Sequence, residues 1–484
     1  MFKKSILLLA LSFCINTSLI AEKIVILGGG LSGLTTAYEL IKNDVHKEHE
    51  IVLFEGRDRL GGRVHTHYFD EGQNSFYEEG GTFIDKDHKQ IKKLAKELKI
   101  KLKKNSFVDK DVFVVDEQKF IKTKDAYYIV DMLVNFLDVF KKRNINWAHY
   151  NAQTMQLEYV KADDYLNGLD EVTKKFLVTY YFDEVGLDLN NMPATALYWI
   201  NEDLKEIKQL LELKKRKIKR TFLSGLANKF AYRYSVKGGM SQLINALENA
   251  INDKVTINLN SKIVSIKKED TMYRLDFENG EECIADRIIV TLPFSTLRHV
   301  NLVDVPLTDL QRLAIQTLPY GQHIKVGIPL DANKDIANDL LYYVNLDHQF
   351  ISWAGQNAMT FFLGSSKSQE YAQDDVNKLV DDLMPGLQSK YEYIKNFGAP
   401  TIKNWVTDPF ALGTYSGRSS ECNIVVFNPS ETIRDIYVFA EPTIDNRFFL
   451  AGEHIMADGS AGHMEGAVRS GKIASGLLLV NLLK

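Results

Sequence analysis

Cysteine is scarce in this chain, which has 3 in 484 residues. Cys14 lies in a segment that we expect to be removed, and the remaining two, Cys283 and Cys422, do not make a disulfide framework. Neither sign of charge dominates, because 59 Lys and Arg against 63 Asp and Glu give a formal net charge of −4. This balance gives no reason to expect a nucleic-acid partner. Metal-ligand spacings, internal repeats and low-complexity tracts are also missing, so no metal is expected.

A long apolar run is missing as well, since the one strongly apolar segment is short and lies at the N-terminus. Two lysines precede an apolar stretch over residues 6–14, and the segment ends in Ile20 and the small residue Ala21. This pattern is typical of a secretory signal peptide over residues 1–21. An uncleaved membrane anchor is the alternative, although polar residues 16–18 leave the run too short for a comfortable span. Cleavage predicts a periplasmic or secreted protein with no stable membrane span; without it the chain is anchored at its N-terminus.

The next residues have the pattern strand, glycine turn, helix, strand. Lys23–Leu27 is short, β-branched and apolar, which predicts a buried parallel strand. A second strand, Glu50–Glu55, ends in a carboxylate about 20 residues after the glycine turn, which is where the dinucleotide fingerprint places its ribose-binding acid. The turn has the spacing G-x-G-x-x-G, and its expected cofactor-binding residues are Gly28, Gly30, Ser32 and Gly33.

The other end of the chain carries a second glycine turn between a strand and a helix. An apolar strand at Phe448–Leu450 runs into Ala451–His454, and Gly462–Ala467 opens a final helix. Glycine at such a turn lets backbone N–H groups approach an anion or a ring closely. The two ends of the chain are therefore expected to converge on one dinucleotide.

Residues 55–63 read EGRDRLGGR, and here the chain resembles the flavin-dependent amine oxidases, the family of monoamine and polyamine oxidases. The resemblance implies FAD, wrapped by Arg57, Gly62 and Arg63, with Arg63 at the pyrophosphate or beside the flavin. Arginine suits this position because its planar fork donates two hydrogen bonds to phosphate. Further family-like blocks cover most of the chain, at residues 79–84, 236–240, 262–266, 287–293 and 405–416.

The resemblance implies an α/β fold, with an FAD-binding, Rossmann-like domain of the glutathione-reductase type and a discontinuous α+β substrate domain. Residues 22–100, 230–300 and 430–484 are assigned to the FAD-binding domain, and residues 101–229 and 301–429 to the substrate domain. The first insert is expected to be helical, as at residues 165–185 and 196–213. The second is expected to supply strands at residues 324–328 and 359–363.

The resemblance also implies the chemistry, which is hydride transfer from the carbon bearing an amine to flavin N5. Hydrolysis of the imine and release of hydrogen peroxide follow. Lys325 matches the family lysine that holds a water near N5, and Tyr415 matches one wall of an aromatic cage over the flavin. His463 stands where the second wall usually lies. The other expected contacts are Val264 to the adenine, Glu453 to the ribityl chain and Met464 to the flavin through its backbone N–H. Trp405, in the block at 405–416, and Gly452, in the C-terminal glycine turn, complete the expected cofactor-binding residues.

Three departures from the family pattern bear on the cofactor and the substrate, and one of them is His463 at the place of the second cage aromatic. Thr414 stands where some members place the cysteine that bonds FAD, so FAD is expected to be non-covalent. Thr82 and Phe83 stand where amino-acid oxidases carry the arginine that grips a carboxylate, which favours an amine over an amino acid as substrate unless another arginine substitutes. The resemblance implies oxygen as the second substrate. The alternatives are a desaturase or protoporphyrinogen-oxidase relative, an L-amino-acid oxidase and a non-catalytic flavoprotein. A basic run at residues 214–220 is interpreted as a solvated helical face.

Overall fold

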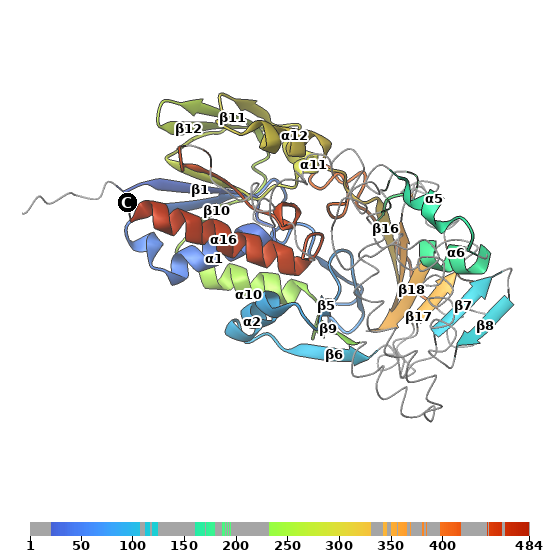
Figure 1. Cartoon of the computed structure of the whole chain (residues 1–484). Coiled ribbons are helices and arrows are strands. Elements are labelled where there is room, and N and C mark those ends of the chain that lie inside the picture. Colours follow the sequence, from blue (N-terminus) through green and yellow to red (C-terminus); the bar gives the residue numbers. More distant parts are fainter. Residues whose placement is uncertain are drawn as a thin grey trace, which may run out of the picture.

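The computed structural model of the chain describes most of its two ends and part of its middle (Figure 1). The described residues are 21–106, 232–330, 397–417, 445–456 and 460–483, with residue 443 and shorter stretches between 112 and 194 and between 342 and 384. The signal segment apart from Ala21, Cys422, the basic run at 214–220 and the helix expected at 196–213 lie outside these residues. Signal cleavage and the domain boundaries stay predictions.

A five-stranded parallel sheet forms the centre of the part that carries the fingerprint. Its strands, in spatial order, are β10 (Thr256–Asn258), β2 (Glu50–Phe54), β1 (Lys23–Leu27), β14 (Arg287–Val290) and β21 (Phe448–Leu450). β1 lies in the middle, and Ile24, Val25 and Ile26 are completely buried because both faces of the sheet are covered. The first and the last strand of the fold thus belong to one sheet, as the sequence predicts.

Helices cover one face of this sheet and a mixed four-stranded sheet covers the other. On the helical face, α1 (Leu31–Lys42), α10 (Ser241–Ile251) and α16 (Met464–Leu482) lie side by side, with α2 (Lys89–Glu97) next to them (Figure 1). Their apolar sides pack against Ile24 and Ile26 of β1. Val25 and Leu27 point the other way, since successive residues of a strand face opposite sides.

The second face is covered by a four-stranded sheet and two helices. These elements are β13 (Glu282–Ala285), β12 (Met272–Phe277), β11 (Ile263–Glu269), β15 (Asn301–Val303), α11 (Phe294–Leu297) and α12 (Asp309–Thr317). α12 begins with a capping box, in which Thr308 accepts a hydrogen bond from the Gln311 N–H and the Gln311 side chain accepts one from the Thr308 N–H.

A seven-stranded sheet lies at the far end of the molecule (Figure 1). Its strands, in spatial order, are β20 (Thr401–Asn404), β16 (His323–Pro329), β19 (Ala358–Gly364), β18 (Phe350–Gly355), β17 (Tyr342–Asn345), β7 (Val112–Asp116) and β8 (Lys119–Thr123). β16 and β19 confirm the two strands expected in the second insert. The expectation of a helical first insert is wrong for β7 and β8. β7 forms a strand because it pairs with β17, which is distant in sequence.

The remaining elements of the described residues are short. They are β3 (Thr66–Tyr68) paired with β4 (Phe76–Glu78), a three-stranded sheet of β5 (Ile84–Asp85), β9 (Tyr232–Val236) and β6 (Leu102–Ser106), the helices α5 (Ala162–Leu166) and α6 (Glu171–Leu177), and the 3-10 turns η1 (Val45–Lys47) and η9 (Glu453–Ile455). α5 and α6 are the described part of the first insert that is helical. Among the described residues, no helix combines the length and apolar character that crossing a bilayer requires.

Candidate active site

A cavity of about 660 Å³ opens at the carboxyl ends of β1 and β2. Both ends of the chain line it, with Gly28 and Gly30 from the N-terminal turn and Gly452, Gly462 and Met464 from the C-terminal segment. Open α/β sheets bind their ligands at this position, beyond the carboxyl ends of the strands. The expected convergence of the two glycine turns is therefore present.

The N-terminal glycines differ in what each one allows. Gly28 has φ of +105°, a conformation that side chains rarely adopt, and its N–H donates to the Phe54 carbonyl at 2.8 Å. A methyl group on Gly30 would have no atom within 4 Å and would point into open space, whereas one on Gly33 would lie 2.0 Å from the Gly28 carbonyl. α1 then begins at Leu31 without a side-chain cap. This bare helix N-terminus fits the pyrophosphate of a dinucleotide.

Ser32 links the first helix to the last. Its hydroxyl lies 3.1 Å from that of Ser470 in α16, and the Ser470 hydroxyl accepts the Gly452 N–H at 2.9 Å. A hydrogen-bonded chain thus connects the fingerprint helix with the turn after β21. Ser32 lines the cavity, but in this structure its hydroxyl contributes to helix packing.

Glu55 lies at the end of β2 and faces the cavity. Its carboxylate accepts the Gly29 N–H at 2.7 Å and the Arg57 N–H at 2.9 Å, so it also holds the glycine turn in shape. Burial raises the pKa of Glu55, against the opposing effect of these two donors. The position suits an acceptor for ribose hydroxyls.

Arg57 is held by a distant acid that the sequence pattern did not single out. Its guanidinium donates to both carboxylate oxygens of Asp408, at 3.0 and 2.5 Å, and lies 5.0 Å from the centre of the Phe410 ring. Lys403 donates to the same carboxylate at 2.6 Å. Burial raises the pKa of Asp408, but the hydrogen bonds from Arg57 and Lys403 outweigh it and lower the pKa below its ordinary value.

Arg63, at the other end of the loop over residues 55–63, is also held by a buried carboxylate. It donates to the Glu453 carboxylate at 2.9 Å and to the Thr414 carbonyl. Glu453 accepts two further hydrogen bonds from Ser416 and one from the Gly462 N–H at 2.8 Å. Burial raises the pKa of Glu453, but the charge of Arg63 and these hydrogen bonds together lower it. Glu453 is therefore the centre of the network that holds the C-terminal turn.

The remaining expected contacts fall into two groups. Gly62, Val264 and Met464 line the cavity, and the Met464 side chain packs so closely on Gly81 that a methyl group there would lie 2.7 Å from the sulfur. Trp405 is not among the lining residues: it is almost fully buried, and its indole N–H donates to the Glu79 carbonyl at 2.7 Å. Trp405 therefore supports the segment at residues 79–81, of which Gly81 lines the cavity.

Lys325 lies on β16, where its side chain is buried against residues 78–82. It is not among the residues that line the cavity. Its ammonium group donates to the Gly80 carbonyl at 2.5 Å, to the Thr82 hydroxyl at 2.8 Å and to the Glu78 carbonyl at 3.3 Å. Burial lowers its pKa to about 8, although the negative charges of Glu78 and Glu79 oppose the shift. Burial also raises the pKa of the Glu78 carboxyl to about 7.

Tyr415 lines the cavity and is oriented by a buried histidine. Its hydroxyl lies 3.4 Å from His323 Nε2, and His323 Nδ1 lies 2.5 Å from the Thr414 hydroxyl, which donates to the Gly321 carbonyl at 2.9 Å. Because Thr414 donates onward, its oxygen accepts from Nδ1, and Nε2 is left to accept from Tyr415. His323 gave no motif in the sequence, and only the backbone contacts of Tyr320 and Gly321, just before β16, with residues 414–416 reveal it.

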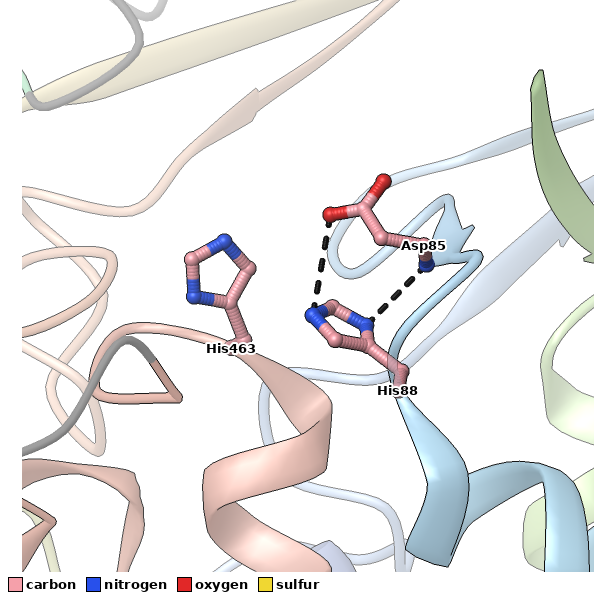
Figure 2. Close-up of side chains that lie close together, drawn as sticks. All are labelled: Asp85, His88 and His463. Carbon is pink, nitrogen blue, oxygen red and sulfur yellow. Dashed lines mark hydrogen bonds and ion pairs between the residues drawn. The ribbon is translucent and has the colours of Figure 1, made fainter. Parts of the chain in front are cut away.

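His463 is the N-cap residue of α16, next to Gly462, and lines the cavity. A methyl group on Gly462 would touch the Tyr415 side chain at 3.6 Å, so the two expected cage positions are close neighbours. The His463 ring lies edge-to-face with His88, their centres 5.1 Å apart, and Asp85 completes the group (Figure 2). Neither His88 nor Asp85 was expected at the site.

Comparison with known proteins identifies the family and the fold. The model of the flavin containing amine oxidoreductase family matches residues 31–479. An L-amino-acid oxidase of Crotalus adamanteus is 22% identical over 486 residues, covering 94% of this chain and 86% of the relative. The fold is similar to that of cyclohexylamine oxidase from Brevibacterium oxydans, with a TM-score of 0.74, 16% identity and coverage of 96% and 100%. It is also similar to putrescine oxidase bound to putrescine, with a TM-score of 0.70, 17% identity and coverage of 95% and 99%.

Proposed function

Because the chain belongs to the flavin containing amine oxidoreductase family, we propose that it oxidises a small amine with oxygen as the electron acceptor. The protein is an enzyme and its cofactor is FAD. FAD, when bound, would supply the acceptor for a hydride from the carbon that bears the nitrogen, and the electrons would pass on to oxygen. The amine would become an imine that hydrolyses, and oxygen would become hydrogen peroxide. The substrate itself is the part of this proposal that the family does not decide.

The observation that best supports the proposal is the single cavity that runs from Glu55 to Tyr415 and His463. The nucleotide half of FAD would lie at the end with Val264, Glu55 and the start of α1. Its flavin would then lie at the other end, between Met464 and the Tyr415 side chain. One chain thus offers an anion-binding helix terminus and an aromatic wall within one space.

The protein's own contribution is to position FAD and the substrate and to exclude water. Arg57 and Arg63 are both held by buried carboxylates, so neither needs to be ordered when FAD binds. We propose that Arg63 neutralises the pyrophosphate or the flavin edge, while Glu453 fixes Arg63 and the Gly462 turn. The ribityl contact expected of Glu453 would be added to the four hydrogen bonds that this carboxylate already accepts.

Lys325 is proposed to act as a cation beside the flavin. Its charge is carried on a buried strand and its three N–H groups point to Glu78, Gly80 and Thr82. Holding a water near the flavin would require it to exchange one of these three acceptors for that water. Residues 78–82, which follow from the end of β4 and include Gly81 of the cavity lining, therefore link Lys325 to the cavity.

Oxidation of an L-amino acid is the second candidate, and one contact favours it. The guanidinium of Arg233 lies 5.8 Å from the centre of the Phe83 ring, beside the position at which amino-acid oxidases carry a carboxylate-binding arginine. Arg233 also pairs with Asp85 at 2.8 Å. A substrate carboxylate at Arg233 would have to share the guanidinium with Asp85.

A panel of substrates tests the proposal. Purified full-length protein is expected to show a flavin absorption spectrum and to release hydrogen peroxide with a monoamine or a diamine, measured by a peroxidase-coupled assay. Tyr415→Phe should keep most of the activity, whereas Tyr415→Ala should lose it, because only the ring forms the wall. Preference for L-amino acids would select the second candidate, and flavin that no amine or amino acid reduces would contradict an oxidase.

A further inference from the structure

Positive charge is concentrated on α2 and the start of β6. Residues 86–104, which form these elements, contain nine lysines and two acids, in a chain whose formal net charge is −4. α2 and β6 lie next to each other in the lower part of the view (Figure 1). None of these lysines belongs to the contacts proposed above for FAD or the substrate, so the charge needs another explanation.

α2 carries lysines on the side opposite to its apolar residues. Ile91 and Leu94 are completely buried and pack into the core under the helix. Lys89, Lys93 and Lys96 are exposed. Their spacing of four and then three residues places them on one face of a helix. The outer face of α2 is therefore a row of ammonium groups.

The row continues through the turn after α2 and along β6. Lys101 and Lys103 are exposed and alternate with Leu102, which packs against the core, so both point outward. Lys237, which follows β9, is also exposed, and its N–H donates to the Lys101 carbonyl at 2.9 Å. The basic surface is defined here as Lys89, Lys93, Lys96, Lys99, Lys101, Lys103 and Lys237.

Few acids neutralise the basic surface. Within the described part of the chain, Lys93 alone of its members forms an ion pair, with Glu97 at 3.9 Å. Lys42 of α1 binds the same carboxylate more closely, at 3.0 Å. The other acid of the segment, Asp87, is exposed and precedes α2. The surface therefore keeps a net positive charge that faces the solvent.

The stability of α2 does not explain its lysines. Lys89 is the first residue of the helix, where a positive charge opposes the helix macrodipole. Lys89 and Lys93 are four residues apart, and like charges at this spacing repel each other. Lys99 has φ of +59° just after the helix, where glycine is favoured. Lysine on β6, the last strand of its described sheet, discourages pairing with other chains, but a helix has no such edge.

The chemistry of the basic surface indicates the kind of partner it fits. All its cations are ammonium groups, which act as point charges, whereas specific recognition of phosphate or nucleic acid relies on the planar fork of arginine. Among the described residues, none of the exposed large apolar side chains lies on α2 or β6, so the surface lacks the apolar anchors of a protein interface. Lysines gathered on one helix face attract the headgroups of anionic lipids.

We propose that the basic surface is a docking surface for the headgroups of an anionic membrane, which it binds reversibly and without inserting. The signal segment predicted at residues 1–21 would bring the chain to a membrane, whereas an exported protein does not meet the nucleic acids of the cell. Attraction of this kind is purely electrostatic, so salt weakens it. The proposal does not depend on the proposed amine oxidation.

The test measures co-sedimentation of purified full-length protein with lipid vesicles. Equimolar phosphatidylglycerol and phosphatidylcholine should bind the wild type more strongly than phosphatidylcholine alone. The double variant Lys89→Gln/Lys96→Gln should lose on the order of tenfold in its partition coefficient on the anionic vesicles. The matched control Lys47→Gln/Lys267→Gln removes the same charge from exposed sites on η1 and β11 and should stay within about twofold of the wild type.

The apolar N-terminal segment is common to all these proteins, so the comparison isolates the basic surface. Raised salt should abolish the difference between the wild type and Lys89→Gln/Lys96→Gln, since it screens the charges. Equal binding of the two double variants, or equal binding of the wild type to anionic and neutral vesicles, would overturn the proposal. Duplex DNA that displaces the wild type from anionic vesicles at the same phosphate concentration would overturn it in favour of a nucleic acid. Circular dichroism checks that each variant is folded, and a failure to oxidise amines would leave this test unchanged.

Discussion

Arg57 and Asp408 are 351 residues apart in sequence and form a bidentate ion pair, with N–O distances of 3.0 and 2.5 Å. The two side chains are only 10% and 2% exposed. The pair joins the loop after β2 to the loop after β20, and so fixes one wall of the FAD cavity to the region of the seven-stranded sheet. Asp408 also neutralises Lys403, so its loss would leave two partly buried cations without their acid.

Asp408→Asn should therefore destabilise the protein strongly and weaken FAD binding. Removing one partner of a buried pair costs about 3 kcal/mol, because the remaining charge stays buried without compensation. Chemical denaturation and FAD titration of the apoprotein measure the two effects. Glu278→Gln is the matched control, since its pair with Lys262 is exposed and should be worth less than about 1 kcal/mol. Equal losses in both variants would mean that the Arg57 pair does not hold the loop.

FAD should leave the protein when the polypeptide is precipitated by acid or heat. Thr414 lines the cavity where a covalent cysteine would stand, and its hydroxyl is engaged by His323 and the Gly321 carbonyl. A hydroxyl in this environment forms no thioether with the flavin. The measurement is flavin absorbance of the supernatant and the pellet, and yellow colour that stays in the washed pellet would refute the prediction.

Lys325→Met should slow the reoxidation of reduced flavin by oxygen far more than it changes FAD affinity. A cation near the flavin stabilises the negative charge that develops as oxygen takes electrons. Because burial lowers the pKa of Lys325 to about 8, the wild-type rate should fall as pH rises through 8, and the variant should show no such step. Stopped-flow absorbance measures both.

Lys262→Met, which removes a lysine at the nucleotide end of the cavity, serves as the control and should reoxidise at the wild-type rate. A wild-type rate in Lys325→Met would exclude Lys325 from the chemistry. Its three hydrogen bonds to residues 78–82 would then be its whole contribution, and the variant would differ only in stability.

His454 should make folding stability depend on pH between 4 and 6.5. Burial lowers its pKa from 6.5 to about 4, and neither ring nitrogen has a hydrogen-bond partner among the described residues. Between these values the unfolded chain binds a proton that the folded protein does not, so stability falls as the pH decreases, by about 3 kcal/mol over the whole range. His454→Phe should remove most of this dependence in urea denaturation at pH 7 and pH 5. His299→Asn, at an exposed histidine, should keep it.

The local patterns of the sequence predicted the core of the FAD-binding fold well. Short apolar strands and a glycine turn are local features: β1 and β2 lie within one residue of their expected ranges, and α1 follows the glycine turn as expected. The roles of the turn glycines could also be predicted locally, and the positive φ of Gly28 and the open space at Gly30 agree with them. The resemblance to a family added Arg63, Tyr415 and Met464, all of which line the cavity.

Tertiary structure decided which side chains meet. Nothing local to Arg57 indicates Asp408, and nothing local to His463 indicates His88 and Asp85, because side-chain pairing across the fold has no periodic signal in the sequence. The same reason explains β7, which is a strand because β17 lies beside it. The sequence by itself thus determined the dinucleotide turn and the family; only the packing of distant segments decided which acid holds each arginine and which groups surround His463.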